Sequence, residues 1–215
     1  MHYTSVLFDL DGTLLDTLGD LTAAMNRTLT RHGLPERTRQ QMRAALGNGA
    51  RRLMELSVPA GTDGALFETL LAEYNADYAA HCRIETAPYP GVDALLRQLH
   101  AQGRKLAIVS NKPDEAVRAL RAEFFADTVP IAVGEKQGIR RKPAPDTLLT
   151  AMVQLGADPA STVYVGDSEV DIATARAAGL PCISVLWGFR DRDLLEQAGA
   201  QHFAADIAQL QALLG

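Results

Sequence analysis

The spacing of apolar residues changes along the chain and divides it into three parts. Residues 3–7 carry apolar and β-branched side chains in a row, which indicates a buried strand. From Leu18 the apolar positions recur at helical spacing, and residues 16–86 contain no segment with the pattern of a strand. We therefore expect a run of helices over residues 18–33, 36–46, from about 50, and 64–81.

Beyond Pro90, short apolar runs alternate with helical patterns. Strands are expected at residues 105–109, 129–133, 161–165 and 182–186, with helices before, between and after them. Strands joined by helices of this length form right-handed βαβ units, which build a parallel sheet covered on both faces. We predict an α/β protein with a doubly wound, Rossmann-like core domain (residues 1–15 and 87–215) and an inserted helical cap domain (residues 16–86).

Composition and charge narrow the class of protein. The 215 residues are 47% hydrophobic and 22% charged, which is ordinary for a soluble globular protein. A net charge of −5 and the lack of a basic run argue against a nucleic-acid partner. The N-terminus lacks the pattern of a signal peptide, and no apolar run is long enough to span a membrane. We expect a cytoplasmic protein in which Cys82 and Cys182 are reduced, although one disulfide is also compatible with the sequence.

Polar side chains follow three of the predicted strands, at the edge of the sheet where open α/β proteins bind ligands. Asp9 and Asp11 follow the first strand, Ser110 follows the second, and Asp167 follows the fourth. Residues two apart on an extended backbone point the same way, so Asp9 and Asp11 should share one side. Gly12 then permits a sharp turn. The alternatives are a solvated acidic turn at Asp11-Gly12 and a helix N-cap at Asp167.

Acids gathered at one edge of a sheet require positive charge. Asp171 lies four residues beyond Asp167, on the same face of a helix, and is the fourth acid expected there. Mg²⁺ binds carboxylate oxygens together with water and substrate phosphate. Lys142, in a loop before Pro143, is a candidate to neutralise phosphate oxygens, although a lone loop lysine is usually a solvated surface residue.

Four motifs in this order resemble those of the haloacid dehalogenase-like (HAD) hydrolase superfamily. They are Asp9-Leu10-Asp11-Gly12-Thr13, Ser110, Lys142-Pro143 and Gly166-Asp167-Ser168-Glu169-Val170-Asp171. The resemblance extends over essentially the whole chain. The helical insert between the first and second motifs resembles the first cap type of that family.

The resemblance implies a role for each motif residue. Asp9 would attack phosphorus and form an aspartyl-phosphate. Asp11 would protonate the leaving oxygen and then take a proton from the hydrolytic water, while Lys142 would stabilise charge. The phosphoryl group would be bound by Gly12, Ser110 and Asn111. Mg²⁺ would be bound by the Asp9 side chain, the Asp11 backbone carbonyl and Asp167, with Asp171 supporting the metal from outside or orienting Lys142.

Two further segments resemble phosphoglycolate phosphatase and its close relatives. They are Gly47-Asn48-Gly49-Ala50 and Trp187-Gly188-Phe189-Arg190. On this interpretation Asn48 and Arg52, and also Arg51, would contact the leaving group of the substrate. The alternatives are a simple helix–helix turn at the Gly-Asn-Gly segment and arginines that face solvent.

We therefore expect a Mg²⁺-dependent phosphatase, a monomer or homodimer, that hydrolyses a small phosphorylated metabolite such as phosphoglycolate. Pyrophosphatase, nucleotidase, sugar-phosphate phosphatase and phosphosugar mutase activities remain alternatives, as does a non-catalytic binding protein. Dehalogenation is disfavoured because Asp11 is present, and dehalogenases of the family lack this second aspartate. A phosphonatase is disfavoured because it would need a cap lysine, and residues 16–86 contain none.

Overall fold

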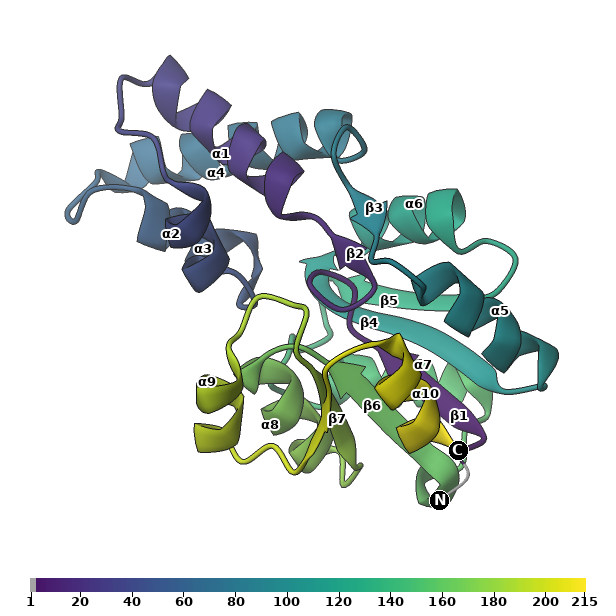
Figure 1. Cartoon of the computed structure of the whole chain (residues 1–215). Helices are drawn as coiled ribbons and strands as arrows, with labels where there is room; N and C mark the ends of the chain where they lie inside the picture. Colours follow the sequence, from purple (N-terminus) through teal and green to yellow (C-terminus); the bar gives the residue numbers. More distant parts are fainter. Residues whose placement is uncertain (1–2) are drawn as a thin grey trace. The chain divides into compact units, whose positions relative to one another are not determined.

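A parallel sheet of six strands lies at the centre of the α/β part of the computed structural model, which describes residues 3–215 (Figure 1). From one edge to the other the strands are β5 (Ile131–Glu135), β4 (Lys105–Pro113), β1 (Ser5–Phe8), β6 (Thr162–Gly166), β7 (Cys182–Val185) and β8 (His202–Ala204). Every neighbouring pair is parallel. The predicted doubly wound sheet is therefore confirmed.

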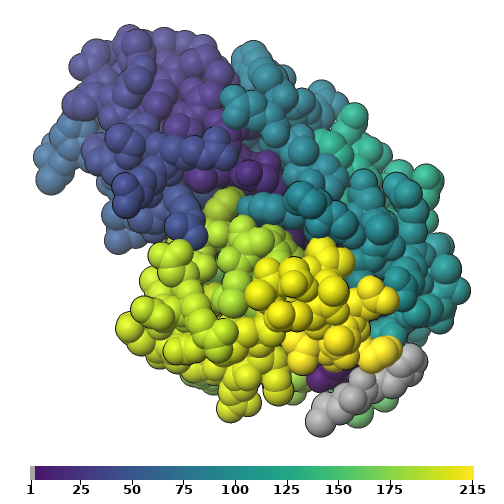
Figure 2. Space-filling model, in the orientation of Figure 1, coloured from purple at the N-terminus to yellow at the C-terminus, as the bar shows by residue number. Residues whose placement is uncertain are grey.

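Helices connect these strands and cover the sheet. They are α5 (Val92–Ala101), α6 (Asp114–Phe124), α7 (Asp146–Leu155), α8 (Glu169–Ala177), α9 (Arg192–Gln197) and α10 (Ile207–Leu214). The yellow C-terminal segment with α10 packs beside the teal segment with α5 (Figure 2). The middle strands are apolar along most of their length because parallel strands with helices on both faces have little contact with water.

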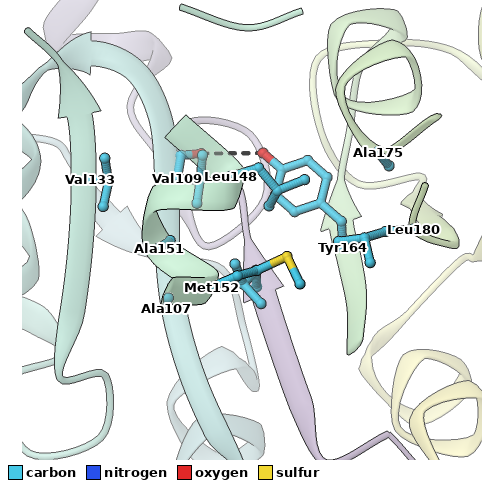
Figure 3. Packing of buried hydrophobic residues seen from close by; sticks show 10 residues of the cluster. Ala107, Val109, Val133, Leu148, Ala151, Met152, Tyr164, Ala175 and Leu180 are labelled. Atoms are coloured by element: carbon cyan, nitrogen blue, oxygen red, sulfur yellow. Dashed lines mark hydrogen bonds between the residues drawn. The ribbon is translucent and has the colours of Figure 1, made fainter. Parts of the chain in front are cut away.

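Alternate residues of the central strands show that both faces of the sheet are buried. Leu7 and Val109 pack against α7 and α8 in one apolar cluster, which surrounds Tyr164 of β6 (Figure 3). Val6 and Phe8, which point to the opposite face, are also fully buried. This double packing fixes the register of β1 and therefore the position of the residues that follow it.

Several elements differ from the sequence-based expectations: the short strands β2 (Leu15–Asp16) and β3 (Ala87–Pro88) were not predicted, and the strand expected at 129–133 lies two residues later. The strand β8 was not predicted, because a three-residue edge strand needs no long apolar run. The strand expected at 105–109 continues to Pro113, with a register shift against β5 after Val109. The helix expected at 36–46 is shorter, because Thr38 forms a capping box with Gln41 and the helix begins at Arg39.

The chain divides into two compact units. One contains Pro88–Gly215 and the N-terminal segment up to Leu15, and the other is Asp16–Ala87. The chain passes between them through β2 (Leu15–Asp16) and β3 (Ala87–Pro88), which pair with each other. The second unit is built from α1 (Leu18–Arg31), α2 (Arg39–Ala45), α3 (Gly49–Ser57) and α4 (Gly64–His81). Among the described residues, no helix is long and apolar enough to cross a membrane.

Asp20 is expected to be a main source of stability in the helical unit. Its buried carboxylate accepts hydrogen bonds from the backbone N–H groups of Ile84 (3.0 Å), Glu85 (3.0 Å) and Thr86 (2.9 Å). Asp20→Ala leaves these three donors without their acceptor and should lower the free energy of unfolding by about 2–4 kcal/mol. Urea unfolding followed by circular dichroism measures the loss. The exposed Glu55→Ala is the control, and equal stability of both variants would contradict the prediction.

Candidate active site

The strand order indicates where a ligand is expected: at the carboxyl edge of the sheet, between β1 and β6. After β1 the chain adds β4 and β5 on one side of this strand, and it then adds β6, β7 and β8 on the other side. The direction in which the sheet grows therefore reverses between β1 and β6. Open α/β sheets bind ligands at such a point. Asp9 directly follows β1, and Asp167 directly follows β6. The sequence pattern and the topology thus bring two acids from distant segments to the same place.

Three buried carboxylates meet there. Oxygen atoms of Asp9, Asp167 and Asp171 lie within 4.8 Å of one another. Asp171 and Asp167 are almost inaccessible to solvent, with 0% and 1% of the residue surface exposed, whereas Asp9 keeps 7%. Asp9 is therefore the acid of this group that a substrate reaches most easily.

Lys142 is the positive charge of this cluster. Its Nζ donates to Asp9 Oδ1 (2.8 Å), Asp171 Oδ1 (2.7 Å) and the Tyr164 hydroxyl (3.0 Å). The side chain is only 3% exposed, so the alternative of a solvated loop lysine is excluded. A buried ammonium is stable only where its protons are hydrogen-bonded, and here three acceptors satisfy it.

Asn111 fixes the loop that carries this lysine. Its Oδ1 accepts from the backbone N–H of Lys142 (2.8 Å), and its Nδ2 donates to the backbone carbonyl of the same residue (3.0 Å). Ser110, next to it on β4, is buried and accepts from the backbone N–H of Lys112 (3.2 Å). Ser110 and Asn111, two of the three residues expected to bind the phosphoryl group, thus lie beside this loop, and Asn111 also holds Lys142 in place.

Asp171 is held by the start of α8. Ser168, not Asp167, is the N-cap of this helix, and it forms a capping box with Asp171. Asp171 Oδ2 accepts from the Ser168 hydroxyl (2.6 Å), and Oδ1 accepts from Lys142 and from Tyr164 (3.1 Å). Both oxygens of Asp171 are therefore engaged. The carboxylate orients Lys142, as one of the two sequence-based alternatives expected.

Asp167 is fixed by two hydrogen bonds, and its side chain packs against two glycines. Its Oδ2 accepts from the backbone N–H of Phe189 (2.7 Å), and its Oδ1 accepts from the Thr13 hydroxyl (3.3 Å). A Cβ on Gly12 or on Gly188 would overlap the Asp167 side chain. Gly12 also has φ +85°, a conformation that glycine adopts without strain. The contacts of Thr13 and Phe189 were not expected from the sequence, although both residues lie in segments that it singled out.

The charges of the cluster do not balance. Three carboxylates face one ammonium group, which leaves an excess of two negative charges in a buried place. Burial raises the pKa of Asp9 well above its ordinary value, and burial together with Asp171 raises the pKa of Asp167 to about 7. Burial opposes the charge of Lys142, but Asp171 and Asp9 outweigh it, and its pKa is raised. A divalent cation would supply the missing charge.

The donor atoms fit Mg²⁺. They are carboxylate oxygens, which are the protein ligands that Mg²⁺ commonly uses. Asp9 Oδ2 takes no hydrogen bond from any residue that the structure describes, and Asp167 Oδ1 receives only the long bond from Thr13. Asp9 and Asp167 therefore each have an oxygen to offer, whereas Asp171 does not.

Asp11 has a different partner from Asp9. The strand β1 ends at Phe8, so the two acids are not alternate residues of one strand. Asp11 Oδ1 accepts from Lys112 Nζ (2.8 Å), and the Lys112 side chain is only 4% exposed. Lys112 was not expected at the site. The available signal was its position directly after Ser110 and Asn111 on a strand that reaches the crevice.

The residues expected to contact the leaving group lie in the helical unit. Asn48 is the N-cap residue of α3 but makes no side-chain capping bond. Arg51 binds Glu68 through two hydrogen bonds of 2.8 Å, and Arg52 binds Glu55 (2.8 Å). Both arginines are exposed. Their contact with substrate stays a prediction.

The chain resembles known proteins over most of its length. The family model of haloacid dehalogenase-like hydrolases matches residues 6–185. A phosphoglycolate phosphatase of Xanthomonas campestris is 36% identical over 187 residues, which is 86% of this chain and 84% of the relative. An N-acetylmuramic acid 6-phosphate phosphatase of Pseudomonas aeruginosa is 32% identical over 208 residues, or 96% of this chain and 90% of the relative.

A solved structure agrees with these sequence matches. A provisionally assigned phosphoglycolate phosphatase from Lactobacillus delbrueckii subsp. bulgaricus has 36% identity and a TM-score of 0.94, covering 100% of this chain and 99% of its own. The family match and the relatives agree with the four motifs in the sequence. The chain belongs to the haloacid dehalogenase-like hydrolase family, and it is a phosphatase that acts on a small phosphorylated metabolite.

Proposed function

We propose that this phosphatase uses Mg²⁺, forms an aspartyl-phosphate on Asp9, and hydrolyses a phosphoglycolate-like phosphomonoester. The observation that carries the proposal is the group of three buried carboxylates around one buried lysine, in which only Asp9 keeps both some exposure and an unpartnered oxygen. A carboxylate with these properties is suited to attack phosphorus.

The surrounding residues support that step. Lys142, which also binds Asp171, fixes the direction of the Asp9 carboxylate, so that one of its oxygens would attack phosphorus while the other would bind Mg²⁺. Ser110 lies in β4 directly after Val109, where the register against β5 shifts, and it would donate to a phosphoryl oxygen. Asp11 would give a proton to the leaving oxygen and then accept one from the hydrolytic water. Phosphoryl transfer depends mainly on such positioning and on charge stabilisation.

Mg²⁺ would be held by the Asp9 side chain, the Asp11 backbone carbonyl and Asp167. When bound, it supplies positive charge that stabilises the transferring phosphoryl group. Thr13 and Phe189 keep Asp167 in place for this task.

The substrate assignment rests on the relatives together with the residues of the site. Relatives that act on phosphoglycolate share about a third of their residues with this chain. The Pseudomonas aeruginosa relative makes N-acetylmuramic acid 6-phosphate a second candidate substrate. Phosphate release from 2-phosphoglycolate, N-acetylmuramic acid 6-phosphate, pyrophosphate, nucleotides and sugar phosphates should give the highest kcat/KM for 2-phosphoglycolate. A higher value for any other class would overturn the assignment.

If Mg²⁺ binds these buried acids, both the stability of the protein and the effect of Mg²⁺ on it should depend on pH. The pKa of Asp167 is raised from an ordinary 3.8 to about 7, so between these values the folded protein binds more protons than the unfolded chain. Without metal, stability should therefore fall by a few kcal/mol as the pH rises from about 4 to about 7. Mg²⁺ binds the ionised acids, so it should raise the melting temperature strongly at pH 8 and little at pH 5.

Thermal unfolding in EDTA and in excess Mg²⁺, at both pH values, measures this effect. Asp167→Asn removes the titrating group and is the matched variant: its stability should depend less on pH and respond less to Mg²⁺. An equal stabilisation by Mg²⁺ at pH 5 and pH 8 would contradict the predicted role of the buried acids.

A further inference from the structure

A second buried lysine, Lys112, lies beside Asp11 and does not belong to the cluster of Asp9, Asp167 and Asp171. Lys112 Nζ donates to Asp11 Oδ1 at 2.8 Å, and the exposed fractions of the two side chains are 4% and 19%. The cluster of Asp9, Asp167 and Asp171 is served by Lys142. The site therefore contains a second buried positive charge, on the side of the acid that would meet the leaving group.

The backbone fixes this second charge. Lys112 belongs to β4, which pairs with β1 in the middle of the sheet, and its backbone N–H is bonded to the Ser110 hydroxyl (3.2 Å). Ser110 in turn is one of the residues expected to bind the phosphoryl group. One short segment thus places a phosphate-binding hydroxyl and an ammonium group two residues apart at the carboxyl edge of the sheet.

Burial of this ammonium calls for a reason. Taking a lysine out of water costs free energy, and the ion pair with Asp11 offsets part of that cost. The Asp11 carboxylate is the more open partner, at 19% exposure. The pair is therefore accessible from the side of Asp11, where a leaving group would lie.

We propose that Lys112 is a specificity-determining residue, which binds an anionic group attached close to the ester oxygen of the substrate. The inference rests on the proposed function, in which Asp11 meets the leaving oxygen. An ammonium 2.8 Å from the Asp11 carboxylate is then within reach of a carboxylate one carbon away from that oxygen. In 2-phosphoglycolate a single CH₂ separates the ester oxygen from the carboxylate, which fits this distance.

The chemistry of this contact separates classes of substrate. Phosphate esters of 2-hydroxy acids place a negative charge where Lys112 lies. N-acetylmuramic acid 6-phosphate carries its carboxylate on a different part of the sugar from the phosphate. Sugar phosphates without an acid group offer Lys112 no charge at all. The ammonium would therefore favour the first class over the other two.

The contact also differs from those expected in the helical unit. Arg51 and Arg52 are bonded to Glu68 and Glu55, and both arginines are exposed at the surface, whereas Lys112 is buried. Ion pairs of this kind exchange readily with water. A desolvated ammonium discriminates more strongly between a charged and an uncharged group, because water screens it less.

A comparison of 2-phosphoglycolate with its amide, 2-phosphoglycolamide, tests the proposal. The two substrates have the same size and phosphate, and they differ in the charge next to the ester oxygen. In the wild-type enzyme, kcat/KM for the acid should exceed that for the amide by about 10- to 100-fold. Lys112→Met should remove this preference, and Lys112→Arg, which keeps the charge, should restore part of it.

The ratio of kcat/KM for the acid to kcat/KM for the amide separates a change in specificity from a general loss of activity. Loss of the pair with Asp11 would slow both substrates in Lys112→Met, but only loss of the anion contact changes their ratio. Lys105→Met, at the exposed beginning of β4, is the control and should keep the wild-type ratio. An unchanged ratio in Lys112→Met, or no preference in the wild type, would overturn the proposal. Failure of the wild type to hydrolyse either substrate or an aryl phosphate would instead overturn the proposed function.

Discussion

Asp9→Asn is expected to lower phosphatase turnover by about 10⁴-fold or more, because it removes the nucleophile while keeping the shape of the side chain. The neutral amide is not a nucleophile toward phosphorus, and the side chain loses its ion pair with Lys142. The variant should fold, because it also removes one of the two uncompensated negative charges in the cluster. Mg²⁺-dependent phosphate release from an aryl phosphate measures the loss.

Covalent trapping separates a nucleophile from a residue that only binds metal. Asp11→Asn should slow hydrolysis of the intermediate, so that intact-protein mass spectrometry detects one added phosphoryl group. The same addition should be absent from the double variant with Asp9→Asn. The exposed Asp127→Asn is the control and should retain full turnover. Activity that survives Asp9→Asn, or a phosphoryl group found on another residue, would remove Asp9 from its proposed role.

The meeting of Asp9 and Asp167 was predictable because the positions of these acids follow from the fold. Alternating strands and helices specify a parallel sheet, and a parallel sheet collects its strand ends at one edge. Polar residues at those ends must then converge, even when they are far apart in sequence. Asp9 and Asp167 meet for this reason. Lys142 was predicted through its motif, since nothing in its loop alone distinguishes it from a surface lysine.

The partners of these residues were less predictable, because they depend on side-chain packing between distant segments. Lys112 contacts Asp11, 101 residues earlier in the chain. Asn111 binds the backbone of Lys142, 31 residues further on. A local sequence pattern describes neither pair. The edge strand β8 was missed for a simpler reason: His202, Phe203 and Ala204 are too few to form an apolar pattern.

The sequence analysis placed Asp9, Asp11, Asp167 and Asp171 in one site, whereas in the structure these acids form two groups, each with its own lysine. Lys142 neutralises part of the cluster of Asp9, Asp167 and Asp171, whereas Lys112 neutralises Asp11. In the proposed function the first group would face the phosphoryl group and the metal, and the second would face the leaving group. Because the two lysines have separate partners, substitutions at each should produce different defects.

Lys142→Met tests the first group and is expected to affect both stability and activity. The substitution keeps the length of the side chain but leaves Asp9 and Asp171 buried without their shared ammonium group. Breaking a buried ion pair in this way should lower the free energy of unfolding by about 3–5 kcal/mol. Turnover should fall by about 10³-fold, because the transferring phosphoryl group loses a fixed positive charge. Urea unfolding and aryl phosphate hydrolysis measure the two effects.

The response to metal distinguishes this explanation from simple loss of packing. Removal of a positive charge next to a cation site should strengthen Mg²⁺ binding, so Mg²⁺ should stabilise Lys142→Met more than it stabilises the wild type. The exposed Lys105→Met should change stability by less than about 0.5 kcal/mol and should respond to Mg²⁺ as the wild type does. A Lys142→Met variant that unfolds like the wild type in the absence of metal would show that Lys142 is not the counterion of the buried acids. Stabilisation by Mg²⁺ that is equal in both proteins would show that the metal and the lysine do not share these carboxylates.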